Sequence, residues 1–134
     1  MSSRKGMTLV LVLVMSALIG LSAMLLFSSA NMEMMITANV RRTNQAKISA
    51  TSGLNHFIAL RLNYNTLRER AGDLQSVQII SESELSPKTS YEVKVHFSND
   101  LNERQYIVES IGYYKKGGKI LASYPVRALF EGGE

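Results

Sequence analysis

The sequence predicts an α+β fold, in which one long N-terminal helix packs on a small antiparallel sheet of three to four strands. Three observations lead to this prediction. Residues 6–32 carry no charge over 27 consecutive positions, helical periodicity then continues to about residue 71, and apolar and polar side chains alternate after residue 72. Besides the apolar segment, the 134 residues leave room for only one small domain.

The first half of the predicted helix, residues 7–30, has the length and composition of a membrane-spanning segment. A helix needs about 20 mostly apolar residues to cross a bilayer, and this segment exceeds that length. Arg4 and Lys5 precede it, and basic flanks stay on the cytoplasmic side of a membrane. The chain is therefore expected to cross the membrane once, with its C-terminal part facing outward.

The second half, residues 31–72, is predicted to continue the same helix as an amphipathic segment. No proline occurs in the first 86 residues, and Gly72 with Asp73 is the expected stop. Because Ala50 and Gly53 are small, we expect another element to approach the helix closely there. They belong to one face with apolar or small residues at spacings of three and four: Ala46, Ala50, Gly53, Phe57, Leu60, Tyr64, Leu67 and Ala71.

Residues 73–134 form the predicted antiparallel sheet domain. Alternation with a period of two predicts strands over 91–97, 105–114 and 120–130, with a turn at 99–102 and a hairpin turn at 115–119. A short additional strand at 77–80 is followed by a polar loop at 81–87. Pro125 cannot donate a ladder hydrogen bond, so its strand is expected at an edge or at a bulge. The apolar stripe of the helix is the expected cover for this sheet.

Composition argues against several classes of function. The absence of cysteine removes disulfides, zinc fingers and thiol catalysis. The formal charge of +4 comes from basic residues scattered among acidic ones, which is not the pattern of a broad nucleic-acid surface. No set of nucleophile, base and orienting group can be assembled from the sequence, so we expect neither an enzyme nor a cofactor or metal site.

A motif stands at the start of the apolar segment. Arg4-Lys5-Gly6 ends a short basic leader, and Met7-Thr8-Leu9 begins the apolar run. This arrangement resembles the class III signal of type IV pilins and type II secretion pseudopilins. The resemblance implies that residues 1–6 are a leader peptide that a prepilin peptidase removes by cutting after Gly6. It also implies that Met7 becomes a methylated N-terminus and that Thr8 and Leu9 occupy the next two positions of an assembly helix.

Two positions further along the helix refine the resemblance. Gly20 matches a place where many members of the family carry a helix-loosening glycine. Leu11 stands where most pilins have a glutamate, whose carboxylate is thought to pair with the N-terminal amine of a neighbouring subunit. Because an unpaired charge in an apolar core is costly, a subunit without this carboxylate is tolerated best at a filament end. The chain is therefore most similar to a PilX-type minor pilin, which helps to initiate or cap a type IV pilus or related filament.

The resemblance also implies a location and partners. The subunit would lie in the bacterial inner membrane, surrounded by lipid and with its C-terminus in the periplasm, before extraction into a pilus or pseudopilus. The expected partners are other minor and major pilins, the prepilin peptidase and the inner-membrane assembly platform. Two alternatives stay open: a secretory signal peptide cut after Ala30, and a membrane-anchored periplasmic accessory protein that keeps residues 1–6.

One hairpin is a candidate contact site for DNA or for an adhesive interaction. Aromatic rings and positive charges gather there and could meet bases and phosphates. A solvated turn is the simpler interpretation, because five residues make a small electrostatic footprint. The residues are Tyr113, Tyr114, Lys115, Lys116 and Lys119.

Three smaller groups of side chains complete the candidates. The methionines at 32, 34 and 35 could suggest copper, but we expect them to pack against neighbouring helices. His56 and His96 are expected to be ordinary surface residues. Glu82 and Glu84 could contribute to a calcium site in the loop at 81–87, although two carboxylates are few for that ion.

Overall fold

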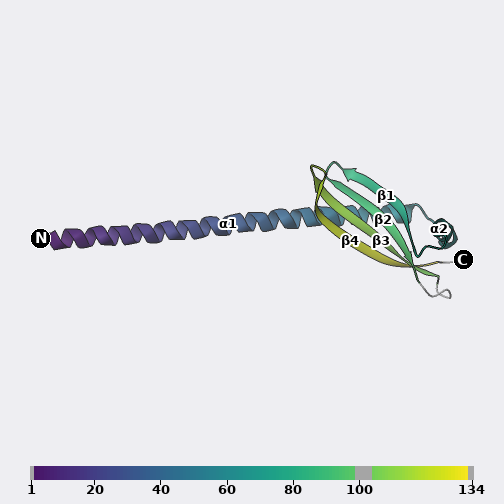
Figure 1. The fold of residues 1–134 in the computed structure, drawn as a ribbon, viewed down its shortest axis with the longest axis horizontal. Helices are drawn as coiled ribbons and strands as arrows, with labels where there is room; N and C mark the ends of the chain where they lie inside the picture. The colour runs from purple at the N-terminus through teal and green to yellow at the C-terminus, as the bar shows by residue number, and fades with distance from the viewer. Residues whose placement is uncertain (1, 99–103, 133–134) are drawn as a thin grey trace. The chain divides into compact units, whose positions relative to one another are not determined.

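The computed structural model describes residues 2–98 and 104–132 (Figure 1). Its elements are α1 (Ser2–Ala59), α2 (Tyr64–Ala71), β1 (Ser76–Ser86), β2 (Thr89–Phe97), β3 (Gln105–Lys116) and β4 (Lys119–Glu131). The predicted α+β class, with one long N-terminal helix packed on an antiparallel sheet, is confirmed. The predicted turn at 99–102 lies outside the described residues.

The chain divides into two compact units, Met1–Ala38 and Asn39–Glu134. The helix α1 contributes to both, because residues up to 38 make up the first unit and residues 39–59 belong to the second. The second unit also holds α2 and the whole sheet. The packing described below takes place within this second unit.

The helix α1 ends earlier than the sequence predicts, so the single helix expected to continue to about residue 71 is wrong. The chain turns at residues 60–63, where Arg61 has a φ of 46°. The amide of Arg61 donates a 3.1 Å hydrogen bond to the carbonyl of Ile58, which closes a tight turn in place of an α-helical one. Leu60, expected in the apolar stripe, is 43% exposed as a result.

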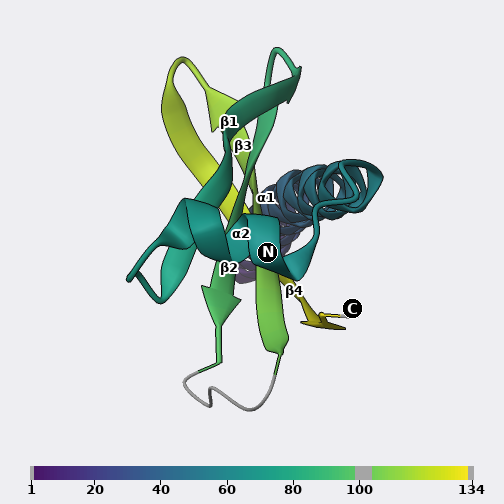
Figure 2. The same cartoon turned by 90° about the vertical axis from the view of Figure 1, so that its right-hand side faces the viewer.

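The break lets α2 cover one end of the sheet (Figure 2). Tyr64 packs edge-on against Phe97, with ring centroids 5.8 Å apart, and lies 6.0 Å from the ring of Tyr106. Leu67, about one helical turn later, is fully buried. Burial of these side chains favours the break over a straight helix, because tertiary packing supplies most of the stability of a short helix. Gly72, with a φ of 58°, ends α2 as predicted.

The four strands form one antiparallel sheet in the order β1-β2-β3-β4. The strands predicted at 91–97, 105–114 and 120–130 are confirmed as β2, β3 and β4. The hairpin predicted at 115–119 is confirmed, with a turn narrowed to residues 117–118 because the strands extend to Lys116 and from Lys119. Both glycines of this turn have positive φ, at 60° and 77°. Pro125 lies on the edge strand β4, opposite Ile111, which confirms the edge placement.

The strand β1 is longer than predicted, and the polar loop expected at 81–87 is wrong. Residues 81–86 belong to the strand, where Ser83 lies opposite Tyr91 and Glu84 opposite Ser90. The register shifts three times along β1, between Gln78 and Ser86. Each irregularity inserts an extra residue or bend, which breaks the alternation by which strands are recognised in a sequence.

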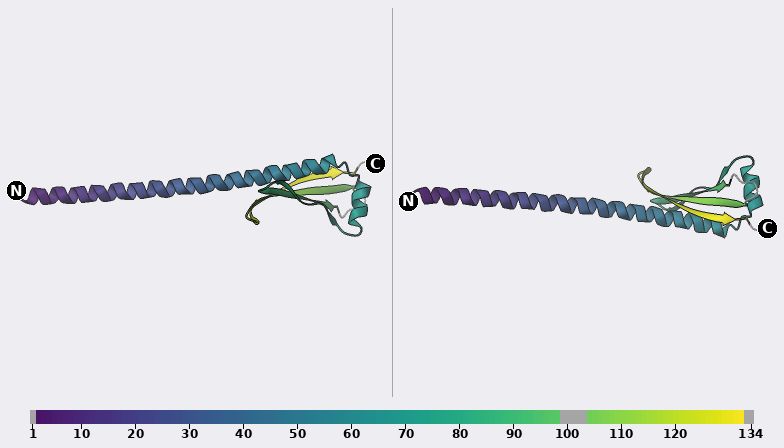
Figure 3. Two further views of the ribbon diagram at one scale, coloured as in Figure 1. Left: turned by 90° about the horizontal axis from the view of Figure 1, so that it is seen from above. Right: turned by 90° about the horizontal axis from the view of Figure 1, so that it is seen from below.

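Residues of α1 run along one face of the sheet, as both views in Figure 3 show. The contact is close because small residues meet. A Cβ atom added to Gly112 on β3 would collide with the carbonyl oxygen of Ala46 and the amide nitrogen of Ala50. One added to Gly53 would lie 2.7 Å from the ring of Tyr91. The close approach predicted near Ala50 and Gly53 is therefore confirmed.

The core of the second unit lies between α1, α2 and this face of the sheet. Its aromatic part includes a stacked pair, in which the rings of Tyr106 and Phe130 lie 5.6 Å apart. A buried hydrogen bond of 2.7 Å from Ser49 Oγ to the carbonyl of Ser90 ties α1 to β2. The buried cluster comprises Phe57, Leu67, Ala71, Ile80, Tyr91, Val93, Val95, Phe97, Tyr106 and Val108.

Candidate functional site

The N-terminal unit is a helix whose apolar side chains are exposed. Over Arg4–Ala59, α1 is long and apolar enough to contain a membrane span, and none of its most apolar 18-residue stretch is buried within the described structure. The Oγ atoms of Ser16 and Ser22 donate to the carbonyls of Val12 and Leu18, at 2.8 and 2.9 Å. Hydroxyls that bond within the helix can lie in hydrocarbon without losing a partner. The unit is therefore compatible with single-pass membrane anchoring.

The residues of the predicted cleavage motif lie within α1. Helical structure begins at Ser2, so Gly6 and Met7 are consecutive residues of one helix. The Oγ1 atom of Thr8 donates to the carbonyl of Arg4 at 2.8 Å, a hydrogen bond that joins the two sides of the predicted cut. Outside the backbone of its own helix and its two chain neighbours, no described atom lies within 4 Å of a Cβ added at Gly6, so no other part of the chain packs against this position.

Met7 and Leu11 share one face of the helix. They line a shallow apolar groove of about 280 Å³ with Val10, Val14, Met15 and Leu18. Met7 is 77% exposed and Leu11 is 59% exposed. Residues four apart in a helix are neighbours on its surface, so the side chain at position 11 lies one turn from residue 7. Leu9 and Gly20 also lie on α1, and outside the neighbouring backbone of that helix no described atom comes within 4 Å of a Cβ added at Gly20.

The methionines at the end of the apolar segment do not share one face. Met32 and Met35 are three residues apart and lie on one side of α1, whereas Met34 is only two residues from Met32 and points elsewhere. All three are more than 60% exposed. This arrangement does not bring three thioethers to one point, which a copper site would need.

Both histidines have side-chain partners, which the sequence did not predict. The Nδ1 atom of His56 lies 2.8 Å from the hydroxyl of Tyr91, a core residue on β2. The Nε2 atom of His96 lies 3.3 Å from Oε2 of Glu109 on the neighbouring strand. No regularity within a single strand or helix indicates such contacts, because each joins two elements.

Two of the five residues of the predicted hairpin site, Tyr113 and Lys115, bond to other side chains of the sheet. Tyr113 donates a 2.7 Å hydrogen bond to Oε1 of Glu92. Burial, followed by this carboxylate, raises the pKa of Tyr113 above its usual value of 10. Lys115 forms an ion pair with Glu82, and its Nζ atom lies 5.8 Å from the centroid of the Tyr113 ring.

The other hairpin residues differ in exposure. Tyr114 is half-buried, opposite Thr89 of β2 and Ala122 of β4. Lys116 and Lys119 are exposed and lie directly opposite each other across the turn. The structure thus brings two lysines to the surface at this tip, and among residues 2–98 and 104–132 no exposed aromatic ring lies beside them on which a base could stack.

Glu82 and Glu84 lie in a strand, where the sequence predicted a loop. Glu82 accepts a 2.7 Å hydrogen bond from Ser90 Oγ and pairs with Lys115. The hydrogen bonds from Lys115 and Ser90 lower the pKa of the Glu82 carboxyl. Ser90 and Lys115 both bond to Oε1 of Glu82. Because this oxygen is engaged within the sheet and calcium sites are normally built from a loop, Glu82 is not arranged as a calcium ligand.

A charged network crosses the face of the sheet that α1 does not cover. Glu109 on β3 accepts from Arg127 Nε at 2.7 Å and contacts His96 at 3.3 Å. Burial alone would raise the pKa of Glu109, but the hydrogen bonds from Arg127 and His96 outweigh it, so the pKa lies below its usual value of 4.5. The ionised form is therefore favoured by folding.

This network predicts a loss of stability in acid. A carboxyl whose pKa is lowered by folding stabilises the protein above its unfolded-state pKa, and this contribution is lost as the pH falls through the folded-state pKa. We expect the melting temperature of the second unit to fall below about pH 4.5, and Glu109→Gln to flatten that fall. Thermal melts followed by circular dichroism in detergent measure both. The exposed carboxyl variant Glu84→Gln is the control, and an equal effect from the two substitutions would contradict the prediction.

Comparisons of the chain with family models, with curated proteins and with solved structures find no match. A functional assignment therefore depends on the motif, the apolar helix and the sheet on which that helix packs.

Proposed function

We propose that this chain is a minor pilin or pseudopilin subunit, processed after Gly6, that helps to initiate or cap a type IV pilus or related filament. The observation that carries the proposal is the extent of α1. One helix contains the cleavage motif at Gly6-Met7, an unburied apolar stretch, and residues 46–57, which pack on the antiparallel sheet. A helix that buries one segment in its own domain leaves the other free to pack in lipid or against neighbouring subunits.

The chemistry of the proposed role lies in Met7 and Leu11. After cleavage the amine of Met7 carries a positive charge, which needs a carboxylate when it enters an apolar helix bundle. Leu11 offers none to a neighbouring subunit, and it shares an apolar face with Met7. Such a subunit fits best where one neighbour is missing, at an end of the filament. In this role the globular unit selects the neighbours, and α1 holds the subunit in the assembly.

Intact-mass spectrometry of the chain purified from its native membrane tests this proposal. We expect a polypeptide that begins at Met7 and carries one added methyl group. A chain that begins at Asn31 would identify a secretory signal peptide and remove the assembly helix. An uncut chain would instead identify a membrane-anchored accessory protein, the second candidate function. Each of the two latter outcomes would overturn the proposal.

Leu11→Glu should change where the subunit sits without changing its processing. The new carboxylate lies one helical turn from residue 7, so it can neutralise the N-terminal amine of a neighbour and remove the preference for a filament end. We expect normal cleavage with a shift of epitope-tagged subunits from filament ends into the shaft. Immunogold labelling of isolated filaments measures this shift. Leu9→Glu, on another side of the helix, is the control, and an unchanged distribution in Leu11→Glu would contradict the end-position argument.

A further inference from the structure

The two hairpin turns lie at the same end of the second unit. In an antiparallel meander, the β1–β2 turn and the β3–β4 turn meet at one end, and the β2–β3 connection lies at the other (Figure 1). The helix α1 enters the unit at the first of these ends. Gly112 on β3 lies against Ala46 and Ala50, whereas Ser110 lies against Gly53, so following β3 toward its turn leads back along α1 toward Asn39. We call this the proximal end.

Positive charge is concentrated at the proximal end. The residues that belong to it lie at or beyond the row formed by Tyr91, Gly112 and Tyr124, which are opposite one another in adjacent strands. Glu82 is counted with them because its carboxylate bonds to Ser90 and Lys115. The basic members number seven, against the two acidic residues Glu82 and Glu84, which gives a charge of +5. The rest of residues 39–134 holds six basic and eight acidic residues, a charge of −2. The basic members are Arg41, Arg42, Lys47, Lys88, Lys115, Lys116 and Lys119.

Several of these basic side chains are exposed and have no acidic partner in the described part of the chain. Lys88, Lys116 and Lys119 are exposed, and within residues 2–98 and 104–132 none of them forms an ion pair. Lys116 and Lys119 face each other directly across the turn. Like charges in that position destabilise a hairpin, so an external anion bound there would relieve a cost that the fold carries.

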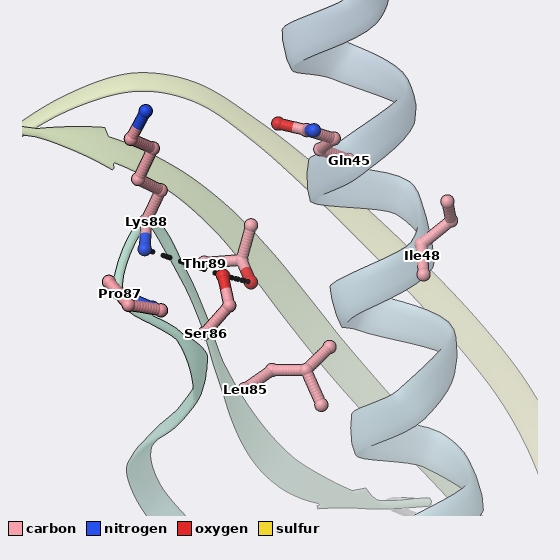
Figure 4. A pocket seen from close by; sticks show the side chains of 7 residues that line it. All are labelled: Gln45, Ile48, Leu85, Ser86, Pro87, Lys88 and Thr89. Carbon is pink, nitrogen blue, oxygen red and sulfur yellow. Dashed lines mark hydrogen bonds between the residues drawn. The ribbon is translucent and has the colours of Figure 1, made fainter.

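An apolar groove at the proximal end is lined by one of these cations, Lys88 (Figure 4). It has a volume of about 310 Å³ and is lined by Gln45 and Ile48 of α1 and by residues 85–89 of the β1–β2 turn. Ile48 is 62% exposed and Leu85 is 48% exposed. Exposed aliphatic side chains flanked by lysine are suited to a bilayer interface, where the apolar groups reach the acyl boundary and the cations meet headgroups.

The second unit follows the membrane-spanning segment after a short stretch of chain. Asn31, where the apolar segment ends, is followed eight residues later by Asn39, where the second unit begins. The intervening residues are helical, so they span about 12 Å. Physiological salt screens charges beyond about 8–10 Å, so the lysines must come into contact with the headgroups to bind them, and this short connection keeps them within reach.

We propose that the proximal end of the second unit docks on anionic phospholipid headgroups of the membrane that α1 enters. Lys88, Lys116 and Lys119 bind the headgroup phosphates, and Ile48 with Leu85 contacts the acyl boundary. The proposal depends on the membrane anchoring in the proposed function and not on cleavage or filament assembly. The exposed aliphatic groups favour lipid over DNA, because a bilayer offers acyl chains next to its phosphates, whereas the DNA backbone offers no comparable apolar surface.

Energy transfer from the protein to the bilayer tests the proposal on the full chain. The chain has no cysteine, so Ile120→Cys places a single fluorophore at the proximal end, and Asn65→Cys on α2 places one at the opposite end. The acceptor is a headgroup-labelled lipid, in bilayers of phosphatidylcholine alone or with phosphatidylglycerol. We expect phosphatidylglycerol to increase transfer from residue 120 and not from residue 65.

A matched pair of charge-reversal variants separates docking from net charge. Lys88→Glu/Lys116→Glu/Lys119→Glu should lower the ratio of docked to undocked protein by about tenfold or more. The control Arg61→Glu/Arg70→Glu/Arg104→Glu changes the net charge equally, at exposed positions away from the proximal end, and should leave the increase intact. Equal loss in both variants would overturn the proposal.

Further measurements distinguish electrostatic docking on lipid from misfolding, from DNA binding and from the lack of a membrane anchor. Salt at about 1 M shortens electrostatic screening to about 3 Å and should abolish the increase in the unsubstituted chain, whatever the variants do to folding. The proposal would be overturned in favour of a DNA surface by two results together. Energy transfer would not depend on phosphatidylglycerol, and the unsubstituted chain would retain DNA that the lysine variant does not. A chain that fails to float with phosphatidylcholine vesicles lacks an anchor, which contradicts the proposed function itself.

Discussion

Gly112→Ala should destabilise the second unit by about 3 kcal/mol and lower its melting temperature by more than about 10 °C. The added Cβ would collide with backbone atoms of Ala46 and Ala50, which cannot move aside by changing a rotamer. The helix α1 would have to shift away from β3, and the buried hydrogen bond from Ser49 to the carbonyl of Ser90 would lengthen with it. Circular dichroism melts in detergent measure the effect.

Gly20→Ala is the matched control for this substitution. It also adds one methyl group to a glycine, but outside the neighbouring backbone of α1 no described atom lies within 4 Å of the new Cβ. We expect the melting temperature of the second unit to stay within about 1 °C of the parent value. If Gly112→Ala melts as the parent does, α1 does not lie against β3 at this point, and the packing described above is wrong.

Gly6→Leu should abolish cleavage of the N-terminal leader and, with it, assembly into a filament. In the proposed function the peptidase needs a residue without a side chain just before the cut, and a leucine there would block the approach of the catalytic groups. Because residues 1–6 would remain, the Met7 amine would never form. Intact-mass spectrometry of the membrane fraction should find only the full-length chain.

The control for this prediction is Gly20→Leu, which makes the same replacement on the same helix away from the motif. It should leave cleavage unchanged, whatever it does to helix packing in a filament. A Gly6→Leu chain that still begins at Met7 would remove the class III motif as the basis of the proposal. A shortened chain with the same N-terminus other than Met7 in both variants would point to a processing site elsewhere in the chain.

The sequence predicts those helices and strands whose apolar periodicity is strong and uninterrupted. The strands β2, β3 and β4 alternate regularly, and Pro125 marked the last of them as an edge. The strand β1 was underestimated because irregular register along residues 78–86 destroys the period of two. The break after Ala59 was missed for a different reason. Leu60 and Arg61 are good helix formers, and only packing of α2 on the end of the sheet makes the turn favourable.

Contacts between distant segments were the least predictable part of the candidate sites. The small residues Ala50 and Gly53 predicted a close approach, but their partner Gly112 was not identified. A lone glycine within an alternating strand is a signal of close backbone approach and could have indicated it. The ion pair between Lys115 and Glu82 joins residues 33 positions apart, and the sequence holds no pattern that relates them.

The way α1 lies on the sheet has a mechanical consequence. The helix lies along one face of the sheet, whose strands cross it obliquely, and its contacts are spread from Ala46 to Phe57. A pull on the N-terminal side of α1 would therefore load these contacts in shear, so that they must rupture together and not one after another. Contacts that must break together withstand a larger force than contacts that break one at a time. The close backbone approach at Gly112 would add a steric barrier to sliding of α1 along the sheet.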